Sequence, residues 1–108
     1  MLRPIEDTMP SGEEDELAQT VTRARRGDSD AFDALFRQFN ARIFGYLARM
    51  VGNDEEGRDL TQETFVKAWR MLPGIHDSAR FGPWLYRIAT NIAIDHLRSR
   101  KVSWLWRR

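Results

Sequence analysis

The chain has 108 residues, no cysteine and a formal net charge of +1 from 17 basic and 16 acidic residues. This length suits one domain with one core, and the missing cysteines exclude disulfides, thiolate metal sites and a cysteine nucleophile. No stretch approaches the roughly 18 apolar residues of a membrane span. The acidic start MLRPIEDTMPSGEEDE is unlike a signal peptide, so we expect a cytoplasmic protein.

The charges are distributed unevenly along the chain. Residues 1–30 hold eight acidic residues and four arginines, a net charge of −4. Residues 80–108 hold seven basic residues and one aspartate, a net charge of +6. This asymmetry predicts a polyanionic partner at the C-terminal end and a different partner toward the front.

The first residues read as a leader followed by a short helix. Two prolines, a glycine and no apolar periodicity predict a disordered acidic leader over residues 1–12. Ser11 followed by Glu14 fits a capping box, and Gly27 suits the end of the helix. Its apolar stripe is Leu17, Val21 and Ala24.

The second helix has the widest apolar stripe, an arc of about 120° that is typical of a core-facing helix. Ser29 or Asp30 is its expected N-cap, and Gly52 closes it before Asn53 opens the next helix. We interpret its aromatic residues as core. The stripe consists of Phe32, Leu35, Phe36, Phe39, Ile43, Tyr46, Leu47 and Met50.

The third helix is predicted over 54–72, with acidic residues in its first turn and Pro73-Gly74 after its end. One half of its helical wheel suits packing: Leu60, Thr64, Phe65, Ala68, Met71 and Leu72, with Trp69 at the margin. The opposite half presents Asp59, Gln62, Glu63, Val66 and Arg70. An acidic patch that includes a valine is either a solvated face or a protein-binding surface.

A loop over 75–82 leads into the fourth helix, which begins near Gly82 because Pro83 suits a first helical turn. One face of this helix packs, through Leu85, Ile88, Ala89, Ile92 and Ser99. The other is basic with one amide: Arg87, Asn91, Ile94, Arg98 and Lys101, with Trp84 at the border. Such a face suits nucleic acid, although a plain solvated face has the same pattern.

The expected fold is all-α, a compact bundle of three long helices plus a short N-terminal helix, over residues 13–102. Residues 103–108 read as a tail or the start of a linker, in which Trp104 to Trp106 either cover the core or make a further contact. His76 and His96 lie about twenty residues apart without carboxylates at metal-ligand spacing. With no catalytic constellation or phosphate-binding glycine loop, we expect neither an enzyme nor a cofactor or metal.

Two stretches together resemble a family. DLTQETFVKAWRML, followed by a short loop and FGPWLYRIATNIAIDHLRSR, is similar to region two of the extracytoplasmic-function (ECF) sigma factors, over roughly residues 31–101. Full-length members continue into a second helical domain, region four. The resemblance implies that the helix over 54–72 docks on the β′ clamp helices of core RNA polymerase through Asp59, Gln62, Glu63, Val66 and Arg70. It also implies an anti-sigma partner.

The resemblance further implies that the fourth helix and the loop before it recognise and melt the minus-ten promoter element. A base of the non-template single strand is flipped into a pocket matched by Ile75, His76, Asp77, Ser78, Arg80 and Asn91. Arg87, Arg98 and Lys101 match phosphate contacts. Trp84 suits either the core or a DNA contact, whereas core packing is favoured for Phe81.

Two other functions fit the same residues. One is a protein-interaction module that binds polymerase or an anti-sigma factor without engaging DNA. The other is a helical regulator that grips duplex DNA unaided. Reversing the charges of Asp59 and Glu63 separates them, because only the duplex-binding regulator would be indifferent or bind DNA more tightly.

Overall fold

The protein is described by a computed structural model over residues 11–106, apart from the side chain of Ser11. Four α-helices follow one another: α2 over Ser11–Arg25, α3 over Ser29–Val51, α4 over Asp54–Met71 and α5 over Phe81–Trp106. Two single 3₁₀ turns, Leu72–Gly74 and Ser78–Arg80, join α4 to α5. The described residues contain no strand, so the predicted all-α class is confirmed.

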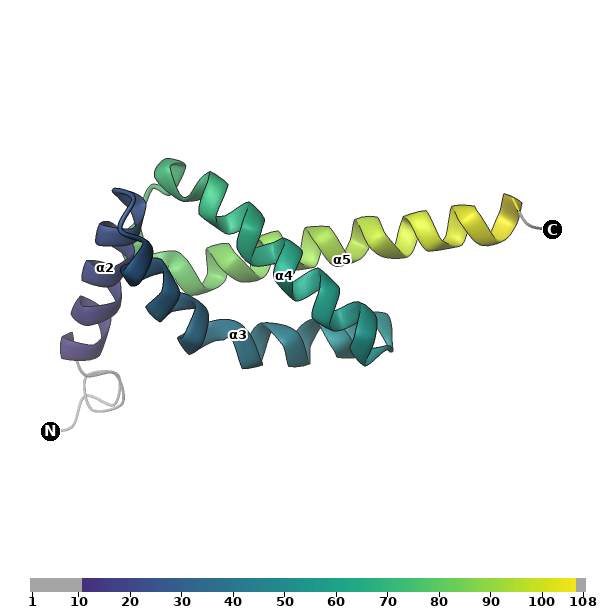
Figure 1. The fold of residues 1–108 in the computed structure, drawn as a ribbon, viewed down its shortest axis with the longest axis horizontal. Helices are drawn as coiled ribbons and strands as arrows, with labels where there is room; N and C mark the ends of the chain where they lie inside the picture. The colour runs from purple at the N-terminus through teal and green to yellow at the C-terminus, as the bar shows by residue number, and fades with distance from the viewer. Residues whose placement is uncertain (1–10, 107–108) are drawn as a thin grey trace, which may run out of the picture.

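The helices form a bundle with one projecting end. In Figure 1, α3 and α4 run antiparallel and diverge from their shared turn, α5 packs against both, and α2 covers the end where α5 begins. The C-terminal turns of α5 extend past the body of the bundle. The predicted leader lies outside the described residues up to position 10, but its last two residues belong to α2.

Side chains at the helix ends explain where the elements start and stop. Asn53 caps α4 by accepting a hydrogen bond from the backbone N–H of Glu56 at 2.8 Å, as expected. Asp28, not Ser29 or Asp30, caps α3, and its carboxylate accepts from the N–H groups of Asp30 and Ala31. The prediction was one to two residues late because Gly27, at φ 99°, turns the chain early enough for Asp28 to become the cap.

The core joins all four helices, and its largest fully buried side chains include Phe81, Leu35 and Ile43. The assignment of Phe81 to the core is therefore confirmed. The predicted packing of Met71 and Ser99 is wrong, because Met71 is 45% exposed and Ser99 is also exposed. Both lie where the facing helix no longer covers the stripe, since α4 ends at Met71 and α5 projects beyond the bundle near Ser99.

Candidate functional site

Five side chains of α4 form an exposed strip that we call the α4 ridge. It consists of Asp59, Gln62, Glu63, Val66 and Arg70, all of them exposed. Leu60, Phe65 and Ala68 are buried on the other side of the helix, so the core fixes the direction in which the ridge points. Val66 is 52% exposed in the middle of charged neighbours, which suits a protein partner better than water alone.

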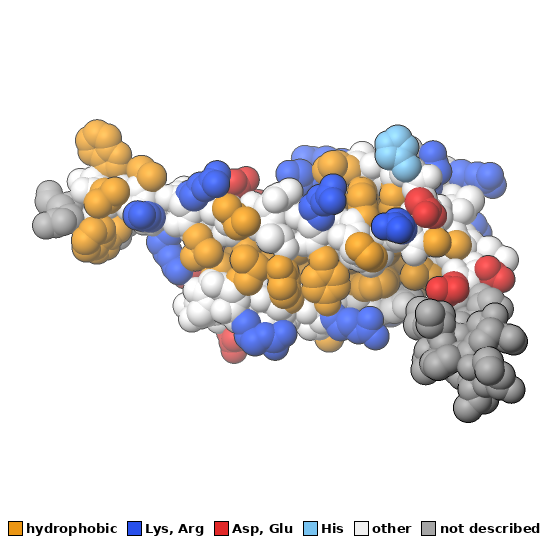
Figure 2. Space-filling model, turned by 180° about the vertical axis from the view of Figure 1, so that it is seen from behind, with side chains coloured by type: hydrophobic (Ala, Val, Ile, Leu, Met, Phe, Trp, Pro, Cys, Tyr) orange, Lys and Arg blue, Asp and Glu red, His pale blue; other side chains and the backbone are white. Residues whose placement is uncertain are grey.

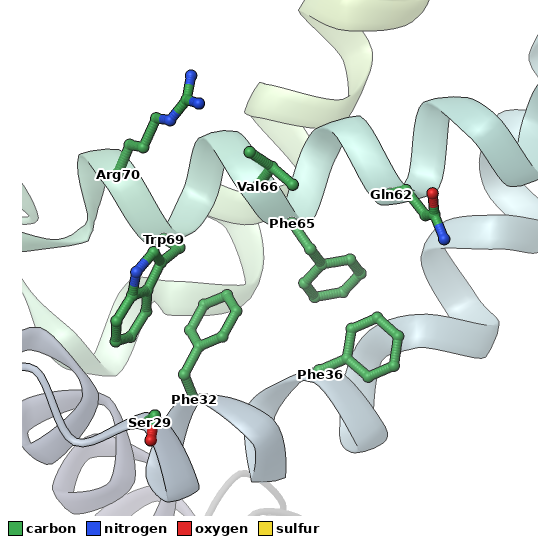
Figure 3. Close-up of a pocket in the computed structure, with 8 residues that line it drawn as sticks. All are labelled: Ser29, Phe32, Phe36, Gln62, Phe65, Val66, Trp69 and Arg70. Atoms are coloured by element: carbon green, nitrogen blue, oxygen red, sulfur yellow. The ribbon is translucent and has the colours of Figure 1, made fainter.

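An aromatic groove of about 610 Å³ lies beside the ridge, where α3 and α4 diverge. Figure 3 shows Phe32 and Phe36 of α3 facing Phe65 and Trp69 of α4 across this space. The ring centroids of Phe36 and Phe65 are 4.9 Å apart, as are those of Phe32 and Trp69. Gln62, Val66 and Arg70 line both the groove and the ridge, so the two features form one surface.

Sequence reasoning missed this groove because Phe32 and Phe36 fall on the apolar stripe of α3 and were assigned to the core. In the structure both are half-buried. A helical wheel reports which way a side chain points, but not how far away the neighbouring helix lies. The margin position predicted for Trp69 was the available signal, and its side chain is 38% exposed.

The loop before α5 is held from inside and presents polar groups outside. Ile75 is only 3% exposed and belongs to the core, which corrects its assignment to a DNA-facing pocket. His76, Asp77 and Arg80 are exposed, and Ser78 is half-buried. The loop shape is stabilised by Asp77, whose carboxylate accepts from the N–H of Ala79 at 3.0 Å. Ser78 also meets the hydroxyl of Thr22 on α2 at 3.2 Å.

The basic face of α5 points away from the core as expected. Arg87, Asn91, Arg98 and Lys101 are all exposed, and none of the three cations forms an ion pair within residues 11–106. Their charges are therefore available to an external anion. Trp84 is half-buried, with its ring centroid 5.7 Å from that of Phe81, so it lies at the boundary between the core and this face.

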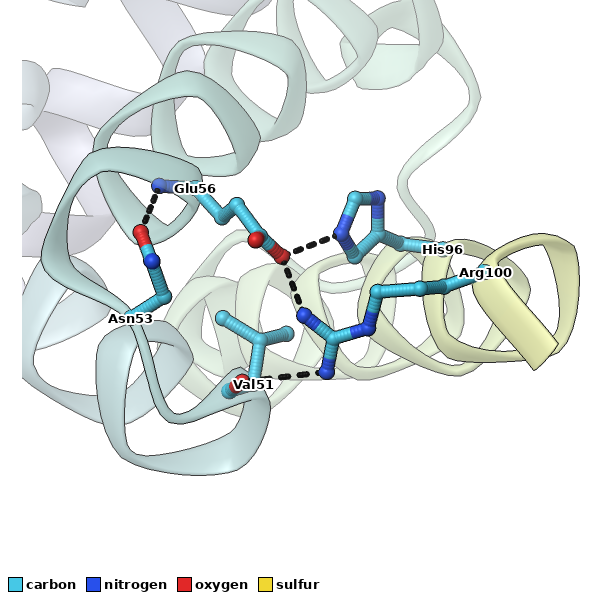
Figure 4. A network of polar contacts seen from close by, with 5 residues as sticks. All are labelled: Val51, Asn53, Glu56, His96 and Arg100. Carbon is cyan, nitrogen blue, oxygen red and sulfur yellow. Dashed lines mark hydrogen bonds and ion pairs between the residues drawn. The ribbon is translucent and has the colours of Figure 1, made fainter. Parts of the chain in front are cut away.

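A polar network fixes α5 to the start of α4 (Figure 4). One carboxylate oxygen of Glu56, Oε1, lies 2.6 Å from His96 Nε2 and 2.7 Å from Arg100 Nη1. Arg100 also donates to the backbone carbonyl of Val51 at 3.3 Å. His96 and Arg100 are one turn apart on α5, so a single acidic residue holds that face of the helix. The pairing of Glu56 with His96 and Arg100 could not be predicted from the sequence, because Glu56 lies far from both residues along the chain.

The described part of the chain holds no cluster of three His, Asp or Glu side chains placed to bind a metal ion. No helix within residues 11–106 is long and apolar enough to cross a membrane. Two candidate binding surfaces lie on the elements that the sequence singled out: the α4 ridge with its groove, and the loop with the basic face of α5.

A model of the Sigma-70 region 2 family matches residues 35–102, which include most of α3, all of α4 and most of α5. The chain belongs to the sigma-70 region 2 family. Among curated relatives of this sigma region 2 chain, the RNA polymerase sigma-H factor of Pseudomonas aeruginosa is 43% identical over 82 residues. The ECF RNA polymerase sigma factor SigW of Bacillus subtilis is 34% identical over 88 residues.

The alignments cover 76% and 82% of the sigma region 2 chain but 42% and 47% of these two relatives. The chain thus spans about half the length of the curated relatives it matches. One similar solved structure is an NMR structure of an engineered region 2 of sigmaE in complex with GTAAAA. It has a TM-score of 0.72 and 32% identity, and the match covers 78% of this chain and 87% of that one.

Proposed function

We propose that this sigma region 2 chain binds core RNA polymerase and recognises and melts the minus-ten promoter element at the start of transcription, in the bacterial cytoplasm. The carrying observation is the exposed, unpaired basic face of α5, in a fold that matches an engineered region 2 of sigmaE in complex with GTAAAA. The sequence similarity to RNA polymerase sigma factors supports the same conclusion.

The α4 ridge and the aromatic groove are the proposed polymerase-binding surface. Their acidic and apolar side chains suit a partner that offers both basic and apolar groups, and we assign that partner to the β′ clamp helices. An anti-sigma factor that covered the same surface would block polymerase directly. The two proposed surfaces lie on different helices, α4 and α5, so that both partners could bind at once.

The loop and α5 are the proposed DNA-binding surface, through His76, Asp77, Ser78, Arg80, Trp84, Arg87, Asn91, Arg98 and Lys101. Flipping a base out of a duplex costs a few kcal/mol, and each stacking contact returns roughly 1–3 kcal/mol. Arg87, Arg98 and Lys101 add attraction to phosphates that weakens with salt. Melting therefore proceeds by capture of one strand and needs no covalent step, so this function calls for no catalytic residue.

The test is fluorescence anisotropy of a labelled library of single strands and matching duplexes, titrated with the chain in the presence and absence of core RNA polymerase. The proposal expects sequence-selective binding to single strands that appears or tightens with polymerase. Binding to polymerase without any DNA selectivity would instead support an interaction module. Equal binding to every sequence, unaffected by polymerase, would overturn the proposal.

A further inference from the structure

A stripe of α3 borders α5 on the face shown in Figure 2. Arg42, Gly45, Tyr46 and Arg49 are spaced three, four and seven residues apart, so they lie on one side of the helix. Arg42 lies over the ring of Phe39, with its guanidinium carbon 5.9 Å from the ring centroid. The Nη1 of Arg49 would be 3.6 Å from a Cβ added at Gly45, so this guanidinium folds back along the same stripe.

This stripe packs against α5 through aromatic side chains. The hydroxyl of Tyr46 meets that of Thr90 at 2.6 Å, and its ring centroid lies 5.2 Å from that of Tyr86. Two turns earlier on α3, the rings of Phe39 and Phe81 are 5.3 Å apart. Tyr46 and Tyr86 are half-buried, so part of each side chain remains on the surface. The junction of α3 and α5, which we call the α3–α5 seam, therefore has an aromatic floor.

Cations flank the seam on both sides. Arg42 and Arg49 lie on the α3 side, while Arg87 and Lys101 project from α5. None of these four forms an ion pair with another residue of 11–106, unlike Arg37, which pairs with Asp33 on the same α3 helix. Figure 2 shows hydrophobic side chains in a band along this face, with Lys and Arg side chains above and below it.

Acidic residues of α2 approach the Arg42 end of the seam. Glu13, Glu14 and Glu16 of α2 line a groove together with Arg42, which lowers the positive potential there. Arg49 lies two helical turns further on, about 10 Å along the axis, and does not line that groove. Arg49 is therefore the cleaner probe of what the seam binds.

We infer that the α3–α5 seam continues the DNA-binding surface of α5, with Arg42 and Arg49 as its second wall, and takes the phosphate backbone of single-stranded DNA. Two rows of unpaired cations around an aromatic floor are the arrangement that holds a single strand. A single basic helix face contacts a DNA strand from one side only. Cations on both sides of the seam would also fix the direction in which the strand runs across the protein. The inference rests on the proposed function, because the seam would hold a further stretch of the same DNA strand that α5 binds.

The test compares Arg49→Ala, Arg49→Lys and the control Arg37→Ala in the full chain, after thermal melting has shown that each is folded. Anisotropy is measured on a labelled single strand carrying GTAAAA between thymidine flanks, and on oligothymidine of the same length, across a salt series. Arg49→Ala is expected to weaken binding of both strands by about three- to tenfold. It should also lower the slope of log affinity against log salt by about 0.7.

Arg49→Lys is expected to retain most of the affinity, because a phosphate contact needs mainly the charge, and Arg37→Ala should match the unmodified chain. The inference is overturned if Arg49→Ala binds like Arg37→Ala while Arg98→Ala weakens binding, a result that leaves the proposed function intact. If the unmodified chain binds neither strand, with or without core polymerase, the proposed function and this inference fail together.

Discussion

Gly57 lies at a close approach of α4 to α3. A Cβ added there would lie 2.7 Å from the Cα of Ala48 and 2.9 Å from its backbone nitrogen, which are backbone atoms that cannot rotate away. The residue is buried in the first turns of α4, next to the hairpin that joins the two helices. Because Gly57 has no side chain, α3 and α4 can lie close together here, and they diverge from this point toward the aromatic groove.

Gly57→Ala is expected to lower the free energy of unfolding by about 1–3 kcal/mol, because the helices must separate to admit the methyl group. The matched control is Gly45→Ala in α3, where the nearest atom to the new Cβ is the Arg49 guanidinium at 3.6 Å. That substitution should raise stability by about 0.5–1 kcal/mol through helix propensity. Urea denaturation measures both, and equal effects would contradict the close-approach explanation.

Asn91 is the one amide on the exposed basic face of α5. An amide side chain discriminates bases, whereas the cations around it bind phosphates of any sequence. Asn91→Ala is therefore expected to lose about 1–3 kcal/mol of discrimination at one promoter position and little elsewhere. Binding of single-strand libraries measures this, and an equal loss on all sequences would exclude base reading by Asn91.

At the scale of elements, Glu56 connects α4 to α5, the helices that carry the proposed polymerase-binding and DNA-binding surfaces. Its carboxylate is the shared acceptor for His96 and Arg100, and the three side chains are partly exposed, at 31%, 31% and 47%. The network lies at the level where α5 leaves the body of the bundle. It therefore fixes the direction of α5 relative to α4 where few apolar contacts do so.

Glu56→Gln is expected to lower the free energy of unfolding by about 1 kcal/mol, since the amide is a weaker acceptor for Arg100 and the pair is partly screened by solvent. Glu55→Gln is the control, because it makes the same change one residue earlier at an exposed position. Guanidinium chloride would mask the charge effect, so urea at low salt is the proper denaturant. A loss as large for Glu55→Gln would assign the effect to the helix dipole instead.

For the whole molecule, the two proposed surfaces lie on different helices, α4 and α5, and their variants should have separate effects. Asp59→Lys combined with Glu63→Lys is expected to weaken polymerase binding at least about tenfold. The two lysines place positive charges where acidic side chains are proposed to contact polymerase. Single-strand binding without polymerase should match that of a control with the same charge change at two exposed residues that do not line the groove beside Arg42, Asp15→Lys with Asp30→Lys.

Arg98→Ala should show the opposite pattern, with weaker single-strand binding and unchanged affinity for polymerase. Both arms are measured by anisotropy, with labelled DNA for one and labelled protein for the other. If either variant lost both activities while remaining folded, the two surfaces would not be independent.

The sequence by itself determined the helices and their faces. Apolar periodicity placed the core stripes of α3 and α5, Gly52 and Asn53 marked a boundary, and the charge pattern separated the α4 ridge from the basic face of α5. These are local properties, because a helix with 3.6 residues per turn assigns each side chain to a face without any partner. The resemblance to the ECF sigma factors added the partners that we propose for those faces.

Only the tertiary structure decided what lies between the helices. It placed Ile75 in the core, opened the groove at Phe32 and Phe36, joined Glu56 to His96 and Arg100, and packed Tyr46 of α3 against Tyr86 of α5. Each depends on the distance and angle between helices far apart in the sequence. These are set by close contacts such as Gly57 on Ala48, and no periodicity within one helix encodes them.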